Sequence, residues 1–393
     1  MWLPELIVLL YFAYVVSYTL IFSLAGLFYR TPHPSGSDRQ HRFCVLIPAY
    51  KEDAVILEAA RKATEQDYPA THYRVAVIAD SLQASTLAAL RNLPIDVVEV
   101  HFESSTKVKS LNQAFATLPE IFDFAVILDG DNVMEPDFLD KINKVVSPAV
   151  RAVQGQRKPK NQNNSLALLD GISEAINNHV YRQGTYALGL SASINGSGVV
   201  FDYAVLKKKL STMDSIGGFD RELEVLLLLD GIRVHYHKDA VVYDEKVSQT
   251  KTFQNQRRRW ISSQYFYLRK YFSAGMKALF RGDFTFFNSA VLRNIQLPRL
   301  INIGLLTVLT GLLFFVRTYL YFDYTWWLAL FALNTFAIFI SIPREYYTFR
   351  LITAMAGLPM IFVRMFLLLF KLKGANKKFI HTPHGVTDTT PKS

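Results

Sequence analysis

The fold of this chain is decided by the stretch Phe122-Asp123-Phe124-Ala125-Val126-Ile127-Leu128-Asp129-Gly130-Asp131-Asn132. Its apolar part, residues 124–128, is short and rich in β-branched and aromatic side chains, which predicts a buried strand. Two aspartates separated by a glycine follow at once, and Gly130 allows the chain to turn sharply there. Because open α/β sheets bind ligands at the carboxyl ends of their strands, we expect Asp129 and Asp131 to face a ligand.

Two carboxylates at such an edge suggest a site for a divalent cation. Asp129 and Asp131 offer the hard oxygen ligands that Mg²⁺ or Mn²⁺ prefers when the ion is shared with a phosphate group. A solvated Asp-Gly turn after a core strand would show the same three residues. The interpretation as a metal site therefore depends on motifs elsewhere in the chain.

The composition indicates a soluble domain joined to membrane segments. The chain has 393 residues, of which 50% are hydrophobic and 13% aromatic, which is rich for a purely soluble protein. Its net charge is +10, and basic residues gather near the apolar segments and at the C-terminus, so we expect membrane lipid rather than nucleic acid as a partner. The single cysteine, Cys44, excludes an internal disulfide and a multi-cysteine zinc site.

A transmembrane anchor is predicted at residues 1–30, because positions 6–29 carry no charged side chain and are long enough to span a bilayer. No basic segment precedes this run, which favours an anchor over a signal peptide. Arginines follow it closely, so the positive-inside rule places the next domain in the cytoplasm, at the inner face of the cell membrane. Residues 31–42 form a polar linker.

An α/β domain is predicted over residues 43–260, where strands and helices alternate. We expect strands at residues 43–47, 74–79, 97–100 and 124–128, and helices near residues 54–65 and 107–118. This alternation implies a mostly parallel sheet. The turn after the first strand, Pro48-Ala49-Tyr50-Lys51-Glu52, contains no glycine, so the dinucleotide-binding fingerprint is absent.

The remainder of the chain is predicted to associate with the membrane. Residues 261–298 suit interfacial helices, residues 299–372 transmembrane helices, and residues 373–393 a basic tail. Within this region, residues 300–316 and 324–343 are uncharged spans, whereas residues 351–372 are interrupted by Pro359 and Arg364. Three crossings here would put the basic tail outside, against the positive-inside rule, so the sequence leaves open whether the last segment crosses.

The order and spacing of five motifs resemble those of family 2 glycosyltransferases. They are Pro48-Ala49-Tyr50-Lys51-Glu52, Asp80 after the second strand, Lys107-Val108-Lys109-Ser110-Leu111-Asn112, Asp129-Gly130-Asp131 and Gln256-Arg257-Arg258-Arg259-Trp260. The last is similar to the Q-x-x-R-W signature of the membrane-embedded, often processive branch, which includes cellulose, chitin, hyaluronan and poly-N-acetylglucosamine synthases. The resemblance covers residues 43–260 and implies a GT-A-like nucleotide-sugar domain.

The resemblance also implies an inverting enzyme with a UDP-sugar donor and Mg²⁺ or Mn²⁺. On the donor side it assigns Asp131 to the metal and Asp129 to the region of the nucleotide and the metal. The other donor-side residues that it implies, for the nucleoside, the phosphates and the departing diphosphate, are Tyr50, Glu52, Asp80, Lys107 and Arg259.

The resemblance assigns acceptor binding to Trp260, whose indole ring would stack on a sugar, and to Gln256 beside it. Gln256, Arg259 and Trp260 stand at i, i+3 and i+4, so on a helix they share one face. The turn Asn195-Gly196-Ser197-Gly198 is similar to the family's glycine-rich turn on the acceptor side.

A base must also remove the proton of the acceptor hydroxyl. The family's spacing, counted back from Gly231, points to Asp220. Phe219 stands where the family has a glutamate, which is a departure from its pattern. Glu222 and Glu224 therefore remain rival candidates for the base.

The sequence leaves several functions open. A processive polysaccharide synthase and a non-processive transferase onto a lipid-linked or other glycan acceptor share nearly all these motifs, and partner subunits are possible for either. An inactive relative acting as a scaffold is a third reading, suggested only by Phe219. A transporter is disfavoured, because intramembrane charge is sparse and the soluble domain is large.

Overall fold

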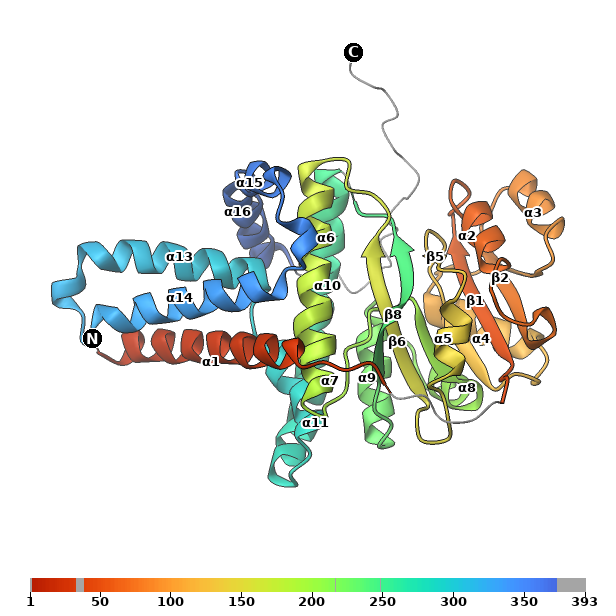
Figure 1. Cartoon of the computed structure of the whole chain (residues 1–393), viewed down its shortest axis with the longest axis horizontal. Helices are drawn as coiled ribbons and strands as arrows, with labels where there is room; N and C mark the ends of the chain where they lie inside the picture. The colour runs from red at the N-terminus through yellow and green to blue at the C-terminus, as the bar shows by residue number, and fades with distance from the viewer. Residues whose placement is uncertain (1, 33–38, 216, 248, 373–393) are drawn as a thin grey trace, which may run out of the picture.

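The centre of the molecule is a sheet with α-helices on both faces. The computed structural model describes residues 2–32, 39–215, 217–247 and 249–372, and within these residues the sheet has eight strands in the order β3-β2-β1-β4-β7-β6-β8-β5 (Figure 1). The strands are β1 (Phe43–Tyr50), β2 (Tyr73–Asp80), β3 (Asp96–Val100), β4 (Phe124–Ile127), β5 (Val133–Met134), β6 (Ala152–Pro159), β7 (Val199–Asp202) and β8 (His235–Asp244). The α/β class and the first four strands are confirmed.

The sheet is mixed, which corrects the expectation of a mostly parallel sheet. β1 pairs in parallel with β2 and β4, and β6 with β8, but β7 runs antiparallel to both β4 and β6. The sequence does not reveal this reversal, because residues 199–201 form an apolar, buried run that is equally typical of a parallel strand. Val199 of β7 pairs with Ile127 of β4, so the turn before β7 lies beside the carboxyl end of β4.

Helices bury both faces of the sheet. One face is covered by α2 (Ile56–Ala63), α3 (Ala84–Arg91) and α5 (Phe138–Asn143), the other by α4 (Lys107–Thr117), α8 (Tyr203–Ser211) and α9 (Phe219–Leu229). Side chains of a strand alternate between faces, so Val45 and Ile47 join the first core while Cys44 and Leu46 join the second. Burial raises the pKa of the Cys44 thiol, as expected for a cysteine that acts as a small hydrophobe.

A long helix, α10 (Thr250–Phe280), connects the sheet domain to the remaining helices. It is continuous, so the boundary expected after Trp260 falls inside it. α6 (Ser165–Asn178) runs into a π-helical turn, His179–Gly184, and the short α7 (Thr185–Ala187). Figure 1 shows α6 and α10 between the sheet and the apolar helices.

Two apolar helices of the described residues, α1 (Trp2–Leu27) and α14 (Tyr324–Ser341), are each long and apolar enough to cross a membrane. Two bent pairs pass the same test when each is taken together: Phe284–Ile295 with Arg299–Phe315, bent by 54°, and Phe349–Met355 with Leu358–Lys371, bent by 47°. These pairs contain α11 (Phe284–Phe287), α12 (Arg293–Ile295), α13 (Arg299–Phe315), α15 (Phe349–Met355) and α16 (Leu358–Leu368). The interrupted last segment therefore forms two helices, with Pro359 in the first turn of the second.

The helices α1, α13 and α14 form a bundle that extends away from the sheet, while α15 and α16 lie at its base (Figure 1). At the sheet end α1 docks closely on the π-helical turn. The Nε2 atom of His179 donates a hydrogen bond of 2.8 Å to the carbonyl oxygen of Ser23. A Cβ atom placed on Gly184 would lie 2.1 Å from the carbonyl oxygen of Phe22, so only glycine permits this approach.

We expect Gly184→Ala to lower the stability of the protein by about 1–3 kcal/mol, because the added methyl group must push the backbone of α1 away. Thermal unfolding in detergent measures this change. Gly311→Ala in α13 is the matched control, since a Cβ there meets nothing within 4 Å. Equal melting temperatures for the two variants would contradict the close approach of α1.

Candidate active site

One cavity of about 880 Å³ opens at the carboxyl ends of the central strands. It is lined by nine of the residues singled out from the sequence: Tyr50, Glu52, Lys107, Asp129, Asp131, Asp220, Gln256, Arg259 and Trp260. These residues come from the end of β1 and the turn after it, α4, the turn after β4, α9 and α10. Asp80 and Glu222, which were predicted to join them, are not part of its lining.

Lys107 connects three of the elements that form the cavity. Its ammonium group, at the start of α4, pairs with the carboxylate of Asp129 and donates a hydrogen bond of 2.8 Å to the carbonyl oxygen of Gly196. The backbone N–H of Asp129 donates to the hydroxyl oxygen of Ser197 at 2.9 Å. The glycine-rich turn before β7 is thereby fixed against the Asp-Gly-Asp motif.

Asp131 lies deeper than Asp129. Asp131 is 6% exposed, and its Oδ2 atom accepts a hydrogen bond of 3.2 Å from the backbone N–H of Glu245, which follows β8. In the described part of the chain, no three His, Cys, Asp or Glu side chains are grouped so that they could hold a metal ion by themselves. Asp129 and Asp131 fit a cation whose remaining ligands come from a bound phosphate and water.

Asp220 lies in the first turn of α9 and faces the same cavity. A Cβ atom on Gly196 would lie 3.7 Å from the Cβ of Asp220, so the aspartate borders the glycine-rich turn. Burial lowers the pKa of the Arg259 guanidinium, while Asp220 and Asp129 act in the opposite direction. Arg259 is thus within electrostatic reach of both carboxylates.

The Phe219 ring, at the position where a glutamate was expected, packs against Lys107. The Lys107 ammonium lies 4.9 Å from the centre of the Phe219 ring. This contact is a cation–π arrangement, which holds the lysine from the side of α9. The departure from the family's pattern therefore has a structural role at the cavity.

The two rival carboxylates are engaged elsewhere. Glu222 pairs with Lys270 and accepts a hydrogen bond of 3.3 Å from the hydroxyl of Tyr267. Glu224, which is 1% exposed, pairs with Arg293 at 2.8 Å and accepts from the backbone N–H of Ile194 at 3.0 Å. Neither lines the cavity, so of the three candidates only Asp220 does.

Asp80 is buried at the carboxyl end of β2, one strand further from the centre of the cavity. Its Oδ1 atom accepts a hydrogen bond of 3.0 Å from the hydroxyl of Ser81. Lys51 and Ser81 both adopt the left-handed backbone conformation, with φ of 56° and 58°. Such strain in residues with side chains costs on the order of 1–3 kcal/mol each and is concentrated at functional sites.

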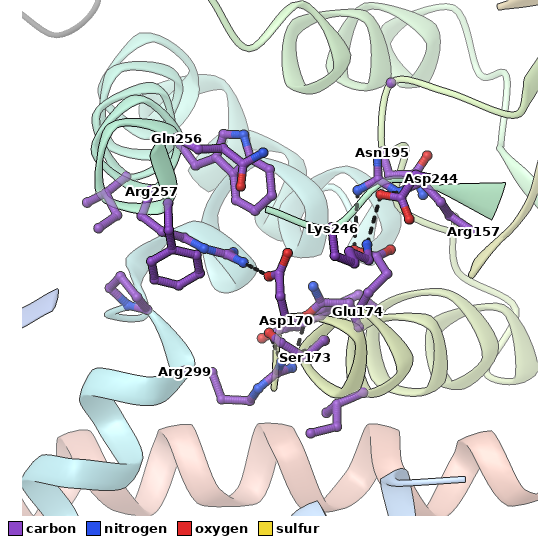
Figure 2. Close-up of a pocket in the computed structure, with 18 of the residues that line it drawn as sticks. Arg157, Asp170, Ser173, Glu174, Asn195, Asp244, Lys246, Gln256, Arg257 and Arg299 are labelled. Atoms are coloured by element: carbon purple, nitrogen blue, oxygen red, sulfur yellow. Dashed lines mark hydrogen bonds and ion pairs between the residues drawn. The ribbon is translucent and has the colours of Figure 1, made fainter. Parts of the chain in front are cut away.

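The helical face predicted for Gln256, Arg259 and Trp260 does line the cavity. The neighbouring Arg257 is held between aromatic rings, with its guanidinium carbon 4.3 Å from the Trp260 ring centre and 4.7 Å from that of Phe253. Arg257 also pairs with Asp170 of α6, as Figure 2 shows. The indole of Trp260 is therefore fixed from one side.

The sequence model of the family described as "Glycosyltransferase like family 2" matches residues 41–263. The chain belongs to this family. It is a glycosyltransferase, and the matched region contains every residue that the sequence analysis assigned to donor or acceptor binding.

Among solved structures, the glycosyltransferase is similar to a mannosyltransferase, PcManGT from Pyrobaculum calidifontis, in complex with GDP-Man and Mn²⁺. The two are 15% identical, with a TM-score of 0.51 over 91% of this chain and 96% of the other. The likeness shows a shared fold that extends beyond the family-matched residues into the apolar helices. TarS 1–349 from S. aureus in complex with UDP-GlcNAc is 18% identical, with a TM-score of 0.40 over 53% of this chain and 59% of the other.

A glucosyl-3-phosphoglycerate synthase from Mycobacterium tuberculosis, in complex with Mn²⁺, UDP and phosphoglyceric acid, is 12% identical, with a TM-score of 0.41 over 59% of this chain and 84% of the other. Among curated proteins, a proline–tRNA ligase from Baumannia cicadellinicola is 26% identical over 148 residues. The chain spans only about a quarter (24%) of the length of that ligase.

A buried network of charges along the cavity of the glycosyltransferase was missed in the sequence. Glu174 of α6 pairs with Arg182 at 2.9 Å and with Arg157 of β6 at 3.3 Å, and Asp244 of β8 pairs with Lys246 at 2.8 Å (Figure 2). β6 and β8 are parallel, so their carboxyl ends share an edge. β6 and β8 contain polar residues along their length, so neither shows the apolar run that marked β4, and the charged residues near their carboxyl ends, Arg157 and Asp244, were the only available signal.

The charges in this network stabilise one another despite burial. Burial alone would raise the pKa of Glu174, but Arg157, Arg182 and Lys246 outweigh it and leave the pKa well below its ordinary value. Burial lowers the pKa of Arg157, and Asp244 and Glu174 reverse that effect and leave it raised. Glu174 and Arg157 are therefore ionised throughout the neutral range.

We expect Glu174→Gln to destabilise the protein by about 3–5 kcal/mol, because it leaves two buried guanidinium groups without their shared carboxylate. The folded pKa of Glu174 is depressed, so its contribution is present above the unfolded pKa of about 4.3 and is lost as the pH falls toward the folded value. Thermal unfolding across a pH series should show the difference between wild type and variant shrinking only in acid. Glu120→Gln, at an exposed carboxylate, is the control, and an equal loss in both variants would contradict the role of the network.

Proposed function

We propose that the protein is an inverting glycosyltransferase of the membrane surface that moves a sugar from a UDP-sugar to a glycan hydroxyl, with Mg²⁺ or Mn²⁺ at Asp129 and Asp131. The observation that carries this proposal is the convergence of Asp131, Asp220, Arg259 and Trp260 on one cavity. Its resemblance to the processive branch favours a role in polysaccharide synthesis.

In the proposed reaction the acceptor hydroxyl loses its proton to the Asp220 carboxylate and attacks the anomeric carbon of the donor. A new bond forms from the acceptor oxygen to that carbon, and the bond from the carbon to the diphosphate breaks. Displacement from the opposite side inverts the configuration. Arg259 and Lys107 carry the cationic groups that would stabilise the departing diphosphate.

The metal would supply Lewis-acid neutralisation of the diphosphate when bound. Asp131 would hold it through an oriented carboxylate, because the Glu245 N–H fixes one of its oxygens. Asp129 would be shared between the metal and Lys107. Trp260, braced by Arg257, would present its free face to the acceptor sugar.

The helix bundle supports a proposal for the membrane arrangement. We propose that α1, α13 and α14 cross the bilayer and that the bent pair α15–α16 stays at the inner surface, as its position at the base of the bundle suggests (Figure 1). With three crossings the N-terminal end of α1 lies outside, whereas the sheet domain and the end of α16 lie inside; the basic tail predicted at residues 373–393 is outside the described residues. This arrangement removes the conflict with the positive-inside rule.

We expect Asp220→Asn to lower kcat by about 10²–10⁴-fold while leaving donor binding intact, because only the proton acceptor is lost. Asp131→Asn should weaken metal-dependent UDP binding as well as turnover, and chelation of the metal should do the same to the wild type. The assay is release of nucleoside diphosphate from a panel of UDP-sugars, with GDP-mannose included, in Mg²⁺ or Mn²⁺. Asp230→Asn is the control, since Asp230 is an exposed aspartate at the other end of α9.

Two outcomes would overturn this assignment. Full activity of Asp220→Asn would move the base to Glu222 or Glu224. A wild type that binds UDP but releases none from any donor would favour the inactive scaffold.

The proposed orientation predicts which surfaces a membrane-impermeant thiol reagent reaches in intact cells. Tyr319→Cys, at an 85% exposed position between α13 and α14, should be labelled, whereas Glu120→Cys on the sheet domain should be labelled only after lysis. The native Cys44 is buried and gives little background. Labelling of Glu120→Cys in intact cells would reverse the orientation.

A further inference from the structure

The cavity that holds Asp131 and Asp220 does not end at the sheet domain. It continues between α13, α14, α15 and α16, where its lining becomes apolar. We call this part the apolar wing and define it by six residues: Ile303, Phe331, Ile338, Phe339, Met355 and Met365. A nucleotide sugar is polar and charged, so an apolar lining does not match it.

Two side chains of the apolar wing also reach the outer surface of the helices. Phe339 of α14 is 59% exposed and Met355 of α15 is 50% exposed, although both line the cavity. Both belong to helices proposed to lie in or at the bilayer. A hydrocarbon chain could therefore enter the wing from the membrane without crossing water.

A cationic group stands where the wing meets the polar part of the cavity. Arg299, the first residue of α13, donates hydrogen bonds to the side-chain oxygen of Asn177 at 2.9 Å and to the carbonyl and hydroxyl oxygens of Ser173 at 2.8 and 2.9 Å (Figure 2). Across residues 2–32, 39–215, 217–247 and 249–372, no carboxylate forms a salt bridge with it. A guanidinium group that lines a cavity with only neutral partners favours an anion, and phosphate matches its geometry.

The neighbouring cations differ from Arg299 in this respect. Arg257 pairs with Asp170, and Arg182 with Glu174, so their charges are already compensated.

In the polar part of the cavity, which also contains Asp220, the side-chain oxygen Oε1 of Gln256 is buried and lacks a hydrogen-bond partner within the described residues. It is an acceptor available to a hydroxyl group of a bound sugar.

We propose that the acceptor of this glycosyltransferase is a single-chain lipid phosphate that carries a sugar. Its hydrocarbon chain lies in the apolar wing, its phosphate contacts Arg299, and its sugar lies between Trp260 and Asp220 with Gln256 as a hydrogen-bond acceptor. The inference rests on the proposed function, because it places the acceptor hydroxyl at Asp220. Each turnover forms one bond from the acceptor oxygen to the donor sugar, breaks the bond from that sugar to the diphosphate, and passes the hydroxyl proton to Asp220.

The size of the cavity favours one hydrocarbon chain over two. Its volume of about 880 Å³ must also hold the nucleotide sugar, and a pocket for one small-molecule ligand usually spans about 300–1,000 Å³. Because the chain moves from one apolar environment to another, the wing contributes position rather than hydrophobic driving force. Selection of the lipid must then come from its phosphate.

The test uses the full-length protein in nanodiscs and geranylgeranyl phosphate with a photoreactive group at the end of its chain. We expect saturable crosslinking, weakened by about tenfold or more in Ile338→Trp, which fills the wing. Leu333→Trp is the matched control, since Leu333 is on the same helix, 42% exposed and outside the cavity, and it should crosslink like wild type. Equal crosslinking by the two variants would overturn the position of the chain.

The headgroup is tested by competition. Geranylgeranyl phosphate should compete at least about tenfold better than geranylgeraniol, as expected for a charge-assisted contact, and Arg299→Gln should remove that difference. Arg299→Lys should restore part of it. Arg317→Gln, at an exposed arginine that donates a hydrogen bond to the Phe314 carbonyl oxygen, should not change it. Equal competition by geranylgeraniol, or by dioleoyl phosphatidic acid, would overturn the choice of a single-chain phosphate.

Binding of UDP with Mn²⁺, measured on the same samples, separates the two proposals. Variants that lose the lipid but keep UDP are folded, and their loss supports the inference. Turnover on soluble sugars with no binding of the lipid phosphate would contradict the inference but not the proposed function. Lipid binding without release of nucleotide from any donor would instead contradict the proposed function.

Discussion

The ion pair between Lys107 and Asp129 is the interaction on which the arrangement of the site depends. It joins the start of α4, the turn after β4 and, through the carbonyl of Gly196, the segment that enters β7. Two aspartates two residues apart at the end of a buried strand repel each other unless a positive charge lies close by. The lysine supplies that charge, and Phe219 supports it from α9, the helix that also carries Asp220. Residues that we propose to serve the donor and the acceptor are thus held in one unit.

Much of this unit could be predicted from the sequence, because its parts obey local rules. Burial on both faces gives β1 and β4 their short apolar runs, and the polar residues that follow such runs collect at one edge of the sheet. The helical spacing of Gln256, Arg259 and Trp260 likewise places them together on α10. In each case the pattern and the structural rule concern fewer than a dozen neighbouring residues.

Other features depend on partners far along the chain and leave no local pattern. The reversed direction of β7 has the same apolar signature as a parallel strand, and it brings the glycine-rich turn to Asp129. Glu222 and Glu224 resemble Asp220 in sequence, and only their distant partners Lys270 and Arg293 show that they face away from the cavity. The network around Glu174 combines β6, α6 and β8 in the same way. The same holds for Arg299, whose neutral hydrogen-bond partners, Asn177 and Ser173, are far from it in the sequence.

The docking of α1 against the π-helical turn has a consequence for how substrates arrive. The backbone of α1 lies directly against Gly184 and accepts a hydrogen bond from the His179 side chain, so α1 is held closely against the helices that border the sheet. On the proposed orientation, the mouth of the cavity keeps a constant height and tilt at the inner leaflet. An acceptor held in that leaflet then reaches the cavity by diffusion in two dimensions, whereas the soluble donor reaches it by diffusion in three. The two substrates meet at a fixed depth.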